Sequence, residues 1–218
     1  MKHFQLLSLL SFSVLPPTAI AISKYRMNLK EYHPFIFILC LASLNEFSSS
    51  ILILNNEENA LNANLYTLAE SILLAWQFSK WVKSVSKTVF LGMLVPVLLA
   101  VWVADNLVLN SPFHFNSLFR ICSAFMMILM SINRINKRLF MSGNQNWKDA
   151  GYLLAVSVLI YFSFKLFIET IFLCKLGLSN AFNIHLFYLL AIVNCCCNLL
   201  LIPAALCIPT KPRFILYC

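Results

Sequence analysis

Charged residues are scarce in this sequence: Asp, Glu, Lys and Arg make up 11% of the 218 residues, whereas 61% are apolar. A soluble globular domain carries about 25% charged residues, so most of this surface is not suited to water. A membrane-spanning helix needs about 20 residues, which gives the chain room for several spans joined by short loops. No segment is left for a folded soluble domain, so any binding or catalysis has to take place in the membrane or at its faces.

Glycine is equally rare, with four in the whole chain. Phosphate-binding loops and dinucleotide-binding turns need closely spaced glycines, and the sequence has neither, nor a nucleophile elbow. Of the four histidines, His3, His33 and His114 fall at membrane edges or in loops, which disfavours a three-histidine zinc site. The last apolar run has no lysine that would hold a retinal. We therefore expect no cofactor and no metal ion.

Eight cysteines would suggest a disulfide framework in a secreted domain. Here Cys40, Cys122 and the run Cys195, Cys196 and Cys197 lie inside apolar stretches, where cysteine behaves as a small hydrophobe. Consecutive helical positions point about 100° apart, so three neighbouring thiols cannot converge on one ion. Packing is the preferred interpretation of the triple cysteine, and a metal or redox role is the alternative.

The apolar runs predict an all-α membrane protein, a seven-transmembrane-helix bundle that forms a single domain over residues 1–218. The spans are expected at about 4–23, 34–54, 63–79, 88–109, 116–133, 150–174 and 184–208. The first run has the features of a signal peptide, with Lys2 before an apolar stretch and small residues near Ala21. A retained helix kinked at Pro16 and Pro17 is the simpler interpretation, because neighbouring helices satisfy the freed backbone groups.

The net charge is +8, but the basic residues are not gathered in one patch with aromatics, so we expect no nucleic-acid partner. They lie at the ends of the apolar runs, where they determine membrane orientation. One side carries Lys24, Arg26, Lys30, Lys80, Lys83, Lys87, Arg134, Lys137, Arg138, Lys148, Lys211 and Arg213. The other side carries Lys2 and Lys175, with Glu57 and Glu58. This bias predicts an outside N-terminus and a cytoplasmic C-terminus.

Ionisable and amide side chains inside the spans form a second pattern. In the predicted orientation nearly all of them fall in the outer half of the bilayer, and the inner halves are almost free of charge. Intramembrane ionisable residues mark functional sites by default. We therefore predict an outward-facing polar pocket that binds a ligand. Its candidate residues are Asn45, Glu46, Tyr66, Glu70, Asp105, Asn116, Arg120, Lys165, Glu169 and His185.

The spacing also predicts ion pairs within this layer. Lys165 and Glu169 are four residues apart and share a helix face. Arg120 is expected to pair with Asp105, because a short connection joins their helices. Glu46 and Glu70 have no obvious cation, which suits a proton carrier or a hydrogen-bond donor. The alternative is that these charges and amides only hold the helices together.

Short motifs accompany this pattern, and they are spread over most of the chain. They are Asn45-Glu46, Tyr66-Thr67-Leu68-Ala69-Glu70, Phe115-Asn116-Ser117 through Arg120, Ile160-Tyr161-Phe162-Ser163, and Ile184-His185 with Asn194 and Asn198. In these segments the chain resembles a group of small seven-span proteins widespread in Bacteroidota. It departs from them at Phe164, where a glycine is expected, and at Cys195 to Cys197. The resemblance implies a bacterial inner-membrane location and seven spans, and implies no activity.

Three functions fit these expectations. The first is a sensor or receptor-like protein that binds a small polar ligand in the outer pocket and signals through a separate cytoplasmic or membrane partner. The second is an intramembrane enzyme acting on a lipid or lipid-linked group, with Glu46 or Glu70 as general acid or base and Arg120 holding a phosphate. The third is a proton-coupled carrier or a structural subunit. The sequence favours them in that order.

Overall fold

The computed structural model describes residues 10–25, 29–81, 86–141, 149–174 and 179–210. Within these residues the chain forms seven α-helices. They are α2 (Leu15–Ser23), α3 (His33–Leu54), α4 (Ala60–Ser79), α5 (Ser86–Val103), α6 (Ser117–Met141), α7 (Ala150–Leu173) and α8 (Asn180–Leu206). Short 3-10 turns precede α2 and α3, at η1 (Phe12–Val14) and η2 (Lys30–Tyr32), and the π-helical η3 (Ala104–Leu109) continues α5. The predicted all-helical architecture is confirmed.

Five helical segments are long and apolar enough to cross a membrane, which marks the chain as a multi-pass membrane protein. They are Lys30–Leu54, Leu91–Leu109, Ser117–Phe140, Ala150–Leu173 and Ile184–Leu206. Helix α4 is long enough but more polar, and the apolar helical stretch Phe12–Ser23 is short. Residues 4–9 of the expected first span lie outside the described residues, as do Lys83, Lys148 and Lys175.

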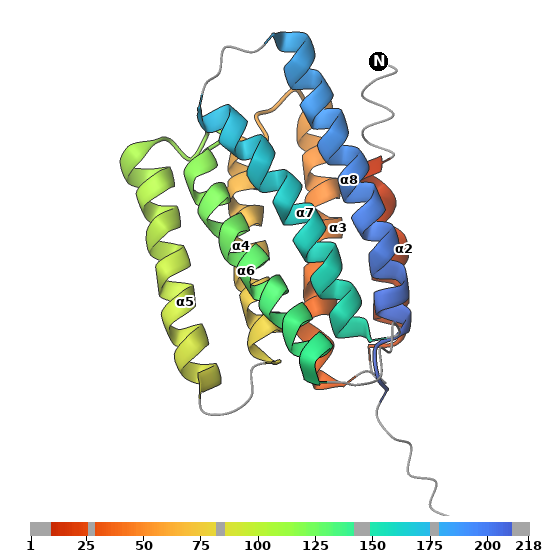
Figure 1. Cartoon of the computed structure of the whole chain (residues 1–218). Coiled ribbons are helices and arrows are strands. Elements are labelled where there is room, and N and C mark those ends of the chain that lie inside the picture. The colour runs from red at the N-terminus through yellow and green to blue at the C-terminus, as the bar shows by residue number, and fades with distance from the viewer. Residues whose placement is uncertain (1–9, 26–28, 82–85, 142–148, 175–178, 211–218) are drawn as a thin grey trace, which may run out of the picture.

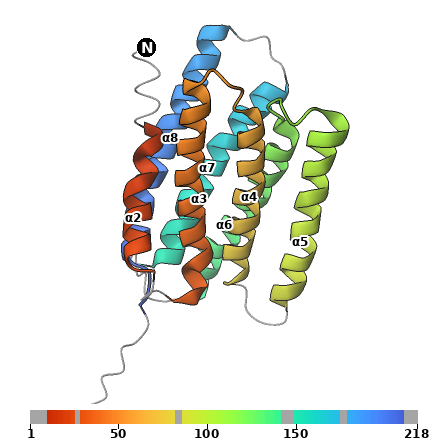
Figure 2. The ribbon, with the colours of Figure 1, turned by 180° about the vertical axis from the view of Figure 1, so that it is seen from behind.

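The helices run alternately up and down and pack as a closed ring (Figures 1 and 2). Around the ring, each helix contacts the next in the order α2, α3, α4, α6, α7 and α8, and α8 returns to α2. Helix α5 stands outside this ring, against α4 and α6. The end at which α2, α4, α6 and α8 finish is called the basic end below. Its described basic residues are Lys24, Lys30, Lys80, Arg134, Lys137 and Arg138.

Helix α6 is longer than the sequence predicted. The expected span stopped at 133, before a cluster of basic residues, but α6 continues to Met141. Arg134 and Arg138 lie on one face of this extension and reach Asp149, at N–O distances of 3.7 and 3.0 Å. Asp149 also accepts a hydrogen bond from the Gly151 N–H at 2.9 Å and so caps α7. The basic cluster is therefore an amphipathic helix end and not a loop.

Asp105 fixes the connection between α5 and α6. Its carboxylate is completely buried, and one oxygen accepts the Phe119 backbone N–H at 2.7 Å while the other accepts the Asn110 side-chain amide at 2.9 Å. Amide groups in the first turn of a helix have no partner within the helix. Asn116 closes the same turn by donating to Asn106 Oδ1 at 3.0 Å and to the Ser111 carbonyl at 2.9 Å. Both residues thus act as structural caps.

We expect Asp105→Ala to lower the free energy of unfolding by about 2–3 kcal/mol, because it leaves a buried N–H without an acceptor. Asp105→Asn keeps one carbonyl oxygen and should lose less. Thermal unfolding of the purified variants in detergent measures both effects. An unfolding temperature of Asp105→Ala equal to that of the parent protein would show that the cap does not stabilise the bundle.

Candidate functional site

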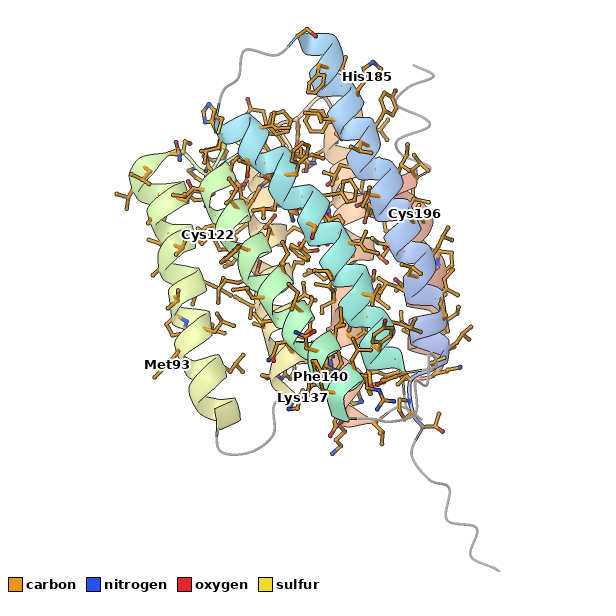
Figure 3. The ribbon with its side chains drawn as sticks, viewed as in Figure 1. Met93, Cys122, Lys137, Phe140, His185 and Cys196 are labelled. Carbon is orange, nitrogen blue, oxygen red and sulfur yellow. The ribbon has the colours of Figure 1, made fainter. Side chains whose placement is uncertain are left out.

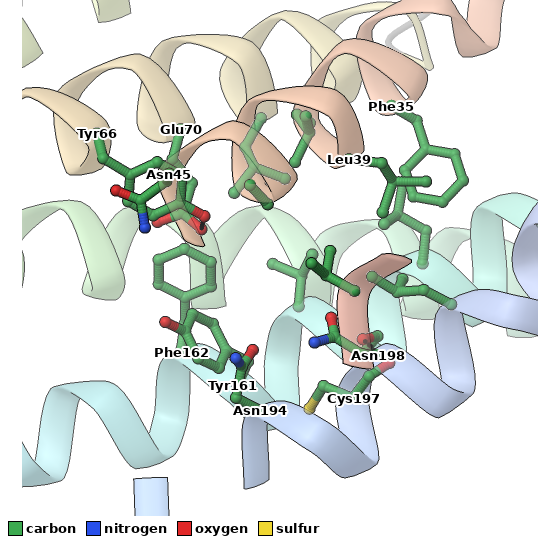
Figure 4. A pocket seen from close by; sticks show the side chains of 18 of the residues that line it. Phe35, Leu39, Asn45, Tyr66, Glu70, Tyr161, Phe162, Asn194, Cys197 and Asn198 are labelled. Carbon is green, nitrogen blue, oxygen red and sulfur yellow. Dashed lines mark hydrogen bonds between the residues drawn. The ribbon is translucent and has the colours of Figure 1, made fainter. Parts of the chain in front are cut away.

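A cavity of about 190 Å³ lies inside the ring, between α3 and α4 on one side and α7 and α8 on the other (Figure 4). One end is apolar and includes Phe35, Leu39 and Leu154. The other end is polar. The polar side chains in its wall are Asn45, Glu46, Tyr66, Glu70, Ser157, Tyr161, Asn194 and Asn198. Four of the residues predicted from depth, Asn45, Glu46, Tyr66 and Glu70, thus face one space.

Glu70 of α4 is neutralised by Lys165 of α7. Lys165 Nζ lies 3.3 Å from Glu70 Oε2, and the two side chains are 7% and 8% exposed. Tyr66 donates its hydroxyl to the other carboxylate oxygen at 2.9 Å. The expected pair between Lys165 and Glu169 is therefore wrong, as is the expectation that Glu70 lacks a cation. Lys165 and Glu70 lie on facing helices in a low-dielectric interior, and Tyr66 adds a second hydrogen bond to Glu70. This arrangement stabilises the pair more than a contact between Lys165 and Glu169, four residues apart on one helix surface.

Arg120 of α6 takes Glu169 of α7 as its partner. Its Nη1 lies 3.2 Å from Glu169 Oε1, and its Nη2 donates to Asn64 Oδ1 of α4 at 3.1 Å. Ser117 adds a hydrogen bond to the second Glu169 oxygen at 2.7 Å. The expected pairing of Arg120 with Asp105 is wrong, because backbone capping already occupies the Asp105 carboxylate.

The predicted polar layer therefore divides into separate parts. Asp105, Asn116, Arg120 and Glu169 belong to a hydrogen-bonded network that joins α4, α5, α6 and α7, and none of them lines the cavity. His185 is exposed near the start of α8, away from the cavity (Figure 3). The contacts of these charged groups fit the alternative interpretation, in which they hold the helices together.

Glu46 differs from Glu70 and Glu169, which each have a cation as partner. It lines the cavity and is half-buried, and among the described residues no lysine, arginine or histidine lies within ion-pair distance of it. The hydroxyl of Ser11 hydrogen-bonds with its side chain. A carboxylate in such a place is costly unless a cation or a proton accompanies it. The cavity thus holds one carboxylate that the described protein does not neutralise.

A row of amide side chains joins the cavity to the end of the bundle opposite the basic end. Asn62 donates to Asn45 Oδ1 at 3.1 Å, to the Ser49 hydroxyl at 3.0 Å and to Asn59 Oδ1 at 3.0 Å. Asn45 lies in the cavity wall, and Asn59 lies in the turn between α3 and α4. This row provides polar groups along the whole path from the cavity to the turn.

Sequence reasoning missed the α8 side of the cavity. Asn194, Cys197, Asn198 and Leu201 line it, and their spacing of three and four residues places them on one helix face. That spacing was the available signal, but the prediction selected polar residues in the outer half of the bilayer, and Asn194 and Asn198 lie near the middle of the predicted span 184–208. Cys197 is buried while its neighbour Cys196 is exposed (Figure 3), so the cysteines of the triple run have different surroundings.

The described residues contain no group of three or more His, Cys, Asp or Glu side chains arranged to hold a metal ion. No protein family, curated protein or solved structure matches this chain.

Removing one partner of the Glu70–Lys165 pair should destabilise the bundle strongly. We expect Glu70→Ala and Lys165→Ala each to cost about 3–5 kcal/mol, because each leaves a buried charge alone. The double variant should cost less than the sum, by at least about 1 kcal/mol. Unfolding of the four proteins in the same detergent measures this coupling, and strictly additive losses would contradict the pairing.

Proposed function

We propose that this protein is a seven-span integral membrane protein of the bacterial inner membrane that binds a small ligand in its central cavity. It acts as a sensor or receptor-like protein, with its N-terminus outside and its C-terminus in the cytoplasm. The observation that carries the proposal is the Glu46 carboxylate, which has no cation partner among the described residues and lies at the polar end of the central cavity. The resemblance to small proteins of Bacteroidota favours the bacterial location.

A sixth span is supported by the way α4 is packed, and a seventh by the place of α2 in the ring between α3 and α8. Helix α4 is less apolar than its neighbours, but its polar residues Asn64, Glu70 and Gln77 are buried against the protein and not turned to lipid. Buried polar groups do not prevent a helix from crossing the bilayer when they are paired. The gathering of basic residues at one end supports the orientation.

The cavity volume limits the size of the ligand. Drug-sized pockets occupy about 300–1,000 Å³, and a cavity of about 150 Å³ holds benzene. At about 190 Å³ this cavity suits a molecule little larger than benzene. Sugars of several units, nucleotides and intact lipids are too large for it.

The charges in the wall define the ligand's chemistry. Lys165 neutralises Glu70, so that carboxylate has little attraction left for a second cation. Glu46 has no such cation, and an ammonium group of a ligand beside it would balance the charge of the Glu46 carboxylate and its own. The apolar end at Leu39, Leu154 and Leu201 would take a hydrocarbon body. We therefore propose a small primary amine with an apolar body, entering along the amide row of Asn45 and Asn62.

The intramembrane enzyme is a weaker candidate. It requires Arg120 to hold a phosphate, but Glu169 and Asn64 bind that guanidinium outside the cavity. Of its two candidates for general acid or base, Glu70 is paired with Lys165, which leaves Glu46 alone. Binding needs only Glu46 and the cavity. A separate partner is part of the proposal because the described residues form a helical bundle without an output domain.

The proposal is tested by thermal unfolding of purified protein with small primary amines, such as benzylamine and short aliphatic amines, each matched with the alcohol of the same carbon skeleton. Amines should stabilise the protein and alcohols should not. Glu46→Gln should weaken amine binding at least about tenfold, because a charged hydrogen bond is lost. Glu57→Gln, which removes an exposed carboxylate, is the matched control and should bind normally. Equal stabilisation of the parent protein and Glu46→Gln would overturn the proposal.

A further inference from the structure

A second hollow, of about 300 Å³, lies at the basic end between α4 and α6. One wall is a stripe of α6 at helical spacing, Met126, Leu129, Met130, Asn133, Arg134 and Lys137, and the other is Phe78 and Trp81 at the end of α4. Leu129 is 47% exposed and Asn133 is exposed, so the hollow faces the outside of the bundle. It is separate from the central cavity and shares no lining residue with it.

Two hydrogen-bond donors at this hollow have no acceptor. Trp81 Nε1 and Arg134 Nε are both buried, and neither has a hydrogen-bond partner within the described protein. A buried donor left without an acceptor is costly. The Arg134 guanidinium lies over the Trp81 ring, 4.7 Å from its centroid, so the two donors belong to one stacked pair. An acceptor from outside the chain would complete both groups.

The positive charge around this hollow favours an anionic group as its ligand. Asp149 is the carboxylate near Arg134, but at 3.7 Å it is further from Arg134 than from Arg138, which it meets at 3.0 Å. Lys137 has no carboxylate within ion-pair distance in the part of the chain that the structure describes. It lies near the end of α6, as Figure 3 shows. Arg134 and Lys137 thus leave an excess of positive charge beside the stacked pair.

The rest of the wall is apolar and suits a hydrocarbon chain. Met126, Leu129, Met130 and Phe78 continue the hollow away from the basic end, towards the middle of the bundle. Methionine side chains adapt to irregular apolar shapes. A free phosphate ion would leave this apolar stripe uncovered, whereas a phospholipid covers it with an acyl chain.

We propose that this hollow, called the groove from here on, binds an anionic phospholipid. Its phosphate lies at Arg134, Lys137 and Trp81, and an acyl chain follows Met126, Leu129 and Met130. A tryptophan and cations at a helix end are the groups that meet lipid headgroups at a membrane interface. Helix α5 stands apart from α6 at the basic end (Figures 1 and 2), and a further hollow of about 680 Å³ lies between α4 and α5 and is lined by Lys80.

The test is a titration of detergent-purified protein with phosphatidylglycerol or with phosphatidylcholine of the same acyl chains, read by thermal unfolding and by retained lipid in native mass spectrometry. Phosphatidylglycerol should bind and stabilise, and phosphatidylcholine should do so weakly. Lys137→Gln should weaken phosphatidylglycerol binding about fivefold, because each basic residue near an anionic surface contributes on that scale. Trp81→Phe keeps the ring under Arg134 and removes its N–H, and should weaken binding about two- to fivefold.

Lys30→Gln is the matched control, because it removes an exposed positive charge at the same end but outside the groove. It should leave phosphatidylglycerol binding unchanged. Equal losses from Lys30→Gln and Lys137→Gln would overturn the site in favour of diffuse charge. Stabilisation by inorganic phosphate equal to that by phosphatidylglycerol would overturn the lipid as occupant, and equal binding of both lipids would overturn its selectivity for anions.

Discussion

The ion pair between Glu70 and Lys165 determines how the centre of this bundle is arranged. Neither group can stay charged in an apolar interior alone, and the side chains are nearly completely buried. Each therefore has to meet the other, which fixes the height and rotation of α4 relative to α7. Tyr66 then reaches the second Glu70 oxygen from one turn away on α4. The polar end of the central cavity is built around these three residues.

Satisfying Glu70 in this way leaves Glu46 as the exception. The other buried carboxylates each have partners in the described protein: Glu70 has Lys165, Glu169 has Arg120, and Asp105 has the start of α6. Glu46 lacks the cation that Glu70 and Glu169 have and the backbone N–H that Asp105 has, so either a proton or a bound ligand has to accompany it. The hydrogen-bonded amides from Asn45 to Asn59 lead to that position, which favours a site.

The helices were predictable from the sequence because apolar length is a property of each segment alone. Helix α3 begins and ends within one residue of its expected limits. Helix α6 was underestimated because the sequence shows Arg134 and Arg138 as charges, not that Asp149 lies opposite them. The predicted ion pairs were wrong for a related reason. Spacing along one helix suggested Lys165 with Glu169, but the choice among partners depends on which helices face each other, and no local pattern contains that.

Helix α4 supplies polar side chains to several parts of the bundle. It supplies Glu70 and Tyr66 to the cavity, Asn64 to the Arg120 network, and Trp81 lies just past its end, at the groove. At its far end Gln77, fully buried, accepts the Phe35 N–H at 2.8 Å and donates to the Glu31 carbonyl at 3.0 Å.

These polar side chains point into the ring and have their partners there, so they do not meet lipid. Helix α5 packs against α4 from outside the ring, and its Trp102 indole donates to the Asn64 carbonyl at 3.2 Å. At the basic end, hollows flank α4 on both sides. An anionic lipid there would complete the enclosure of α4 that α5 begins. The groove and the cavity are thus two consequences of placing one polar helix inside an apolar bundle.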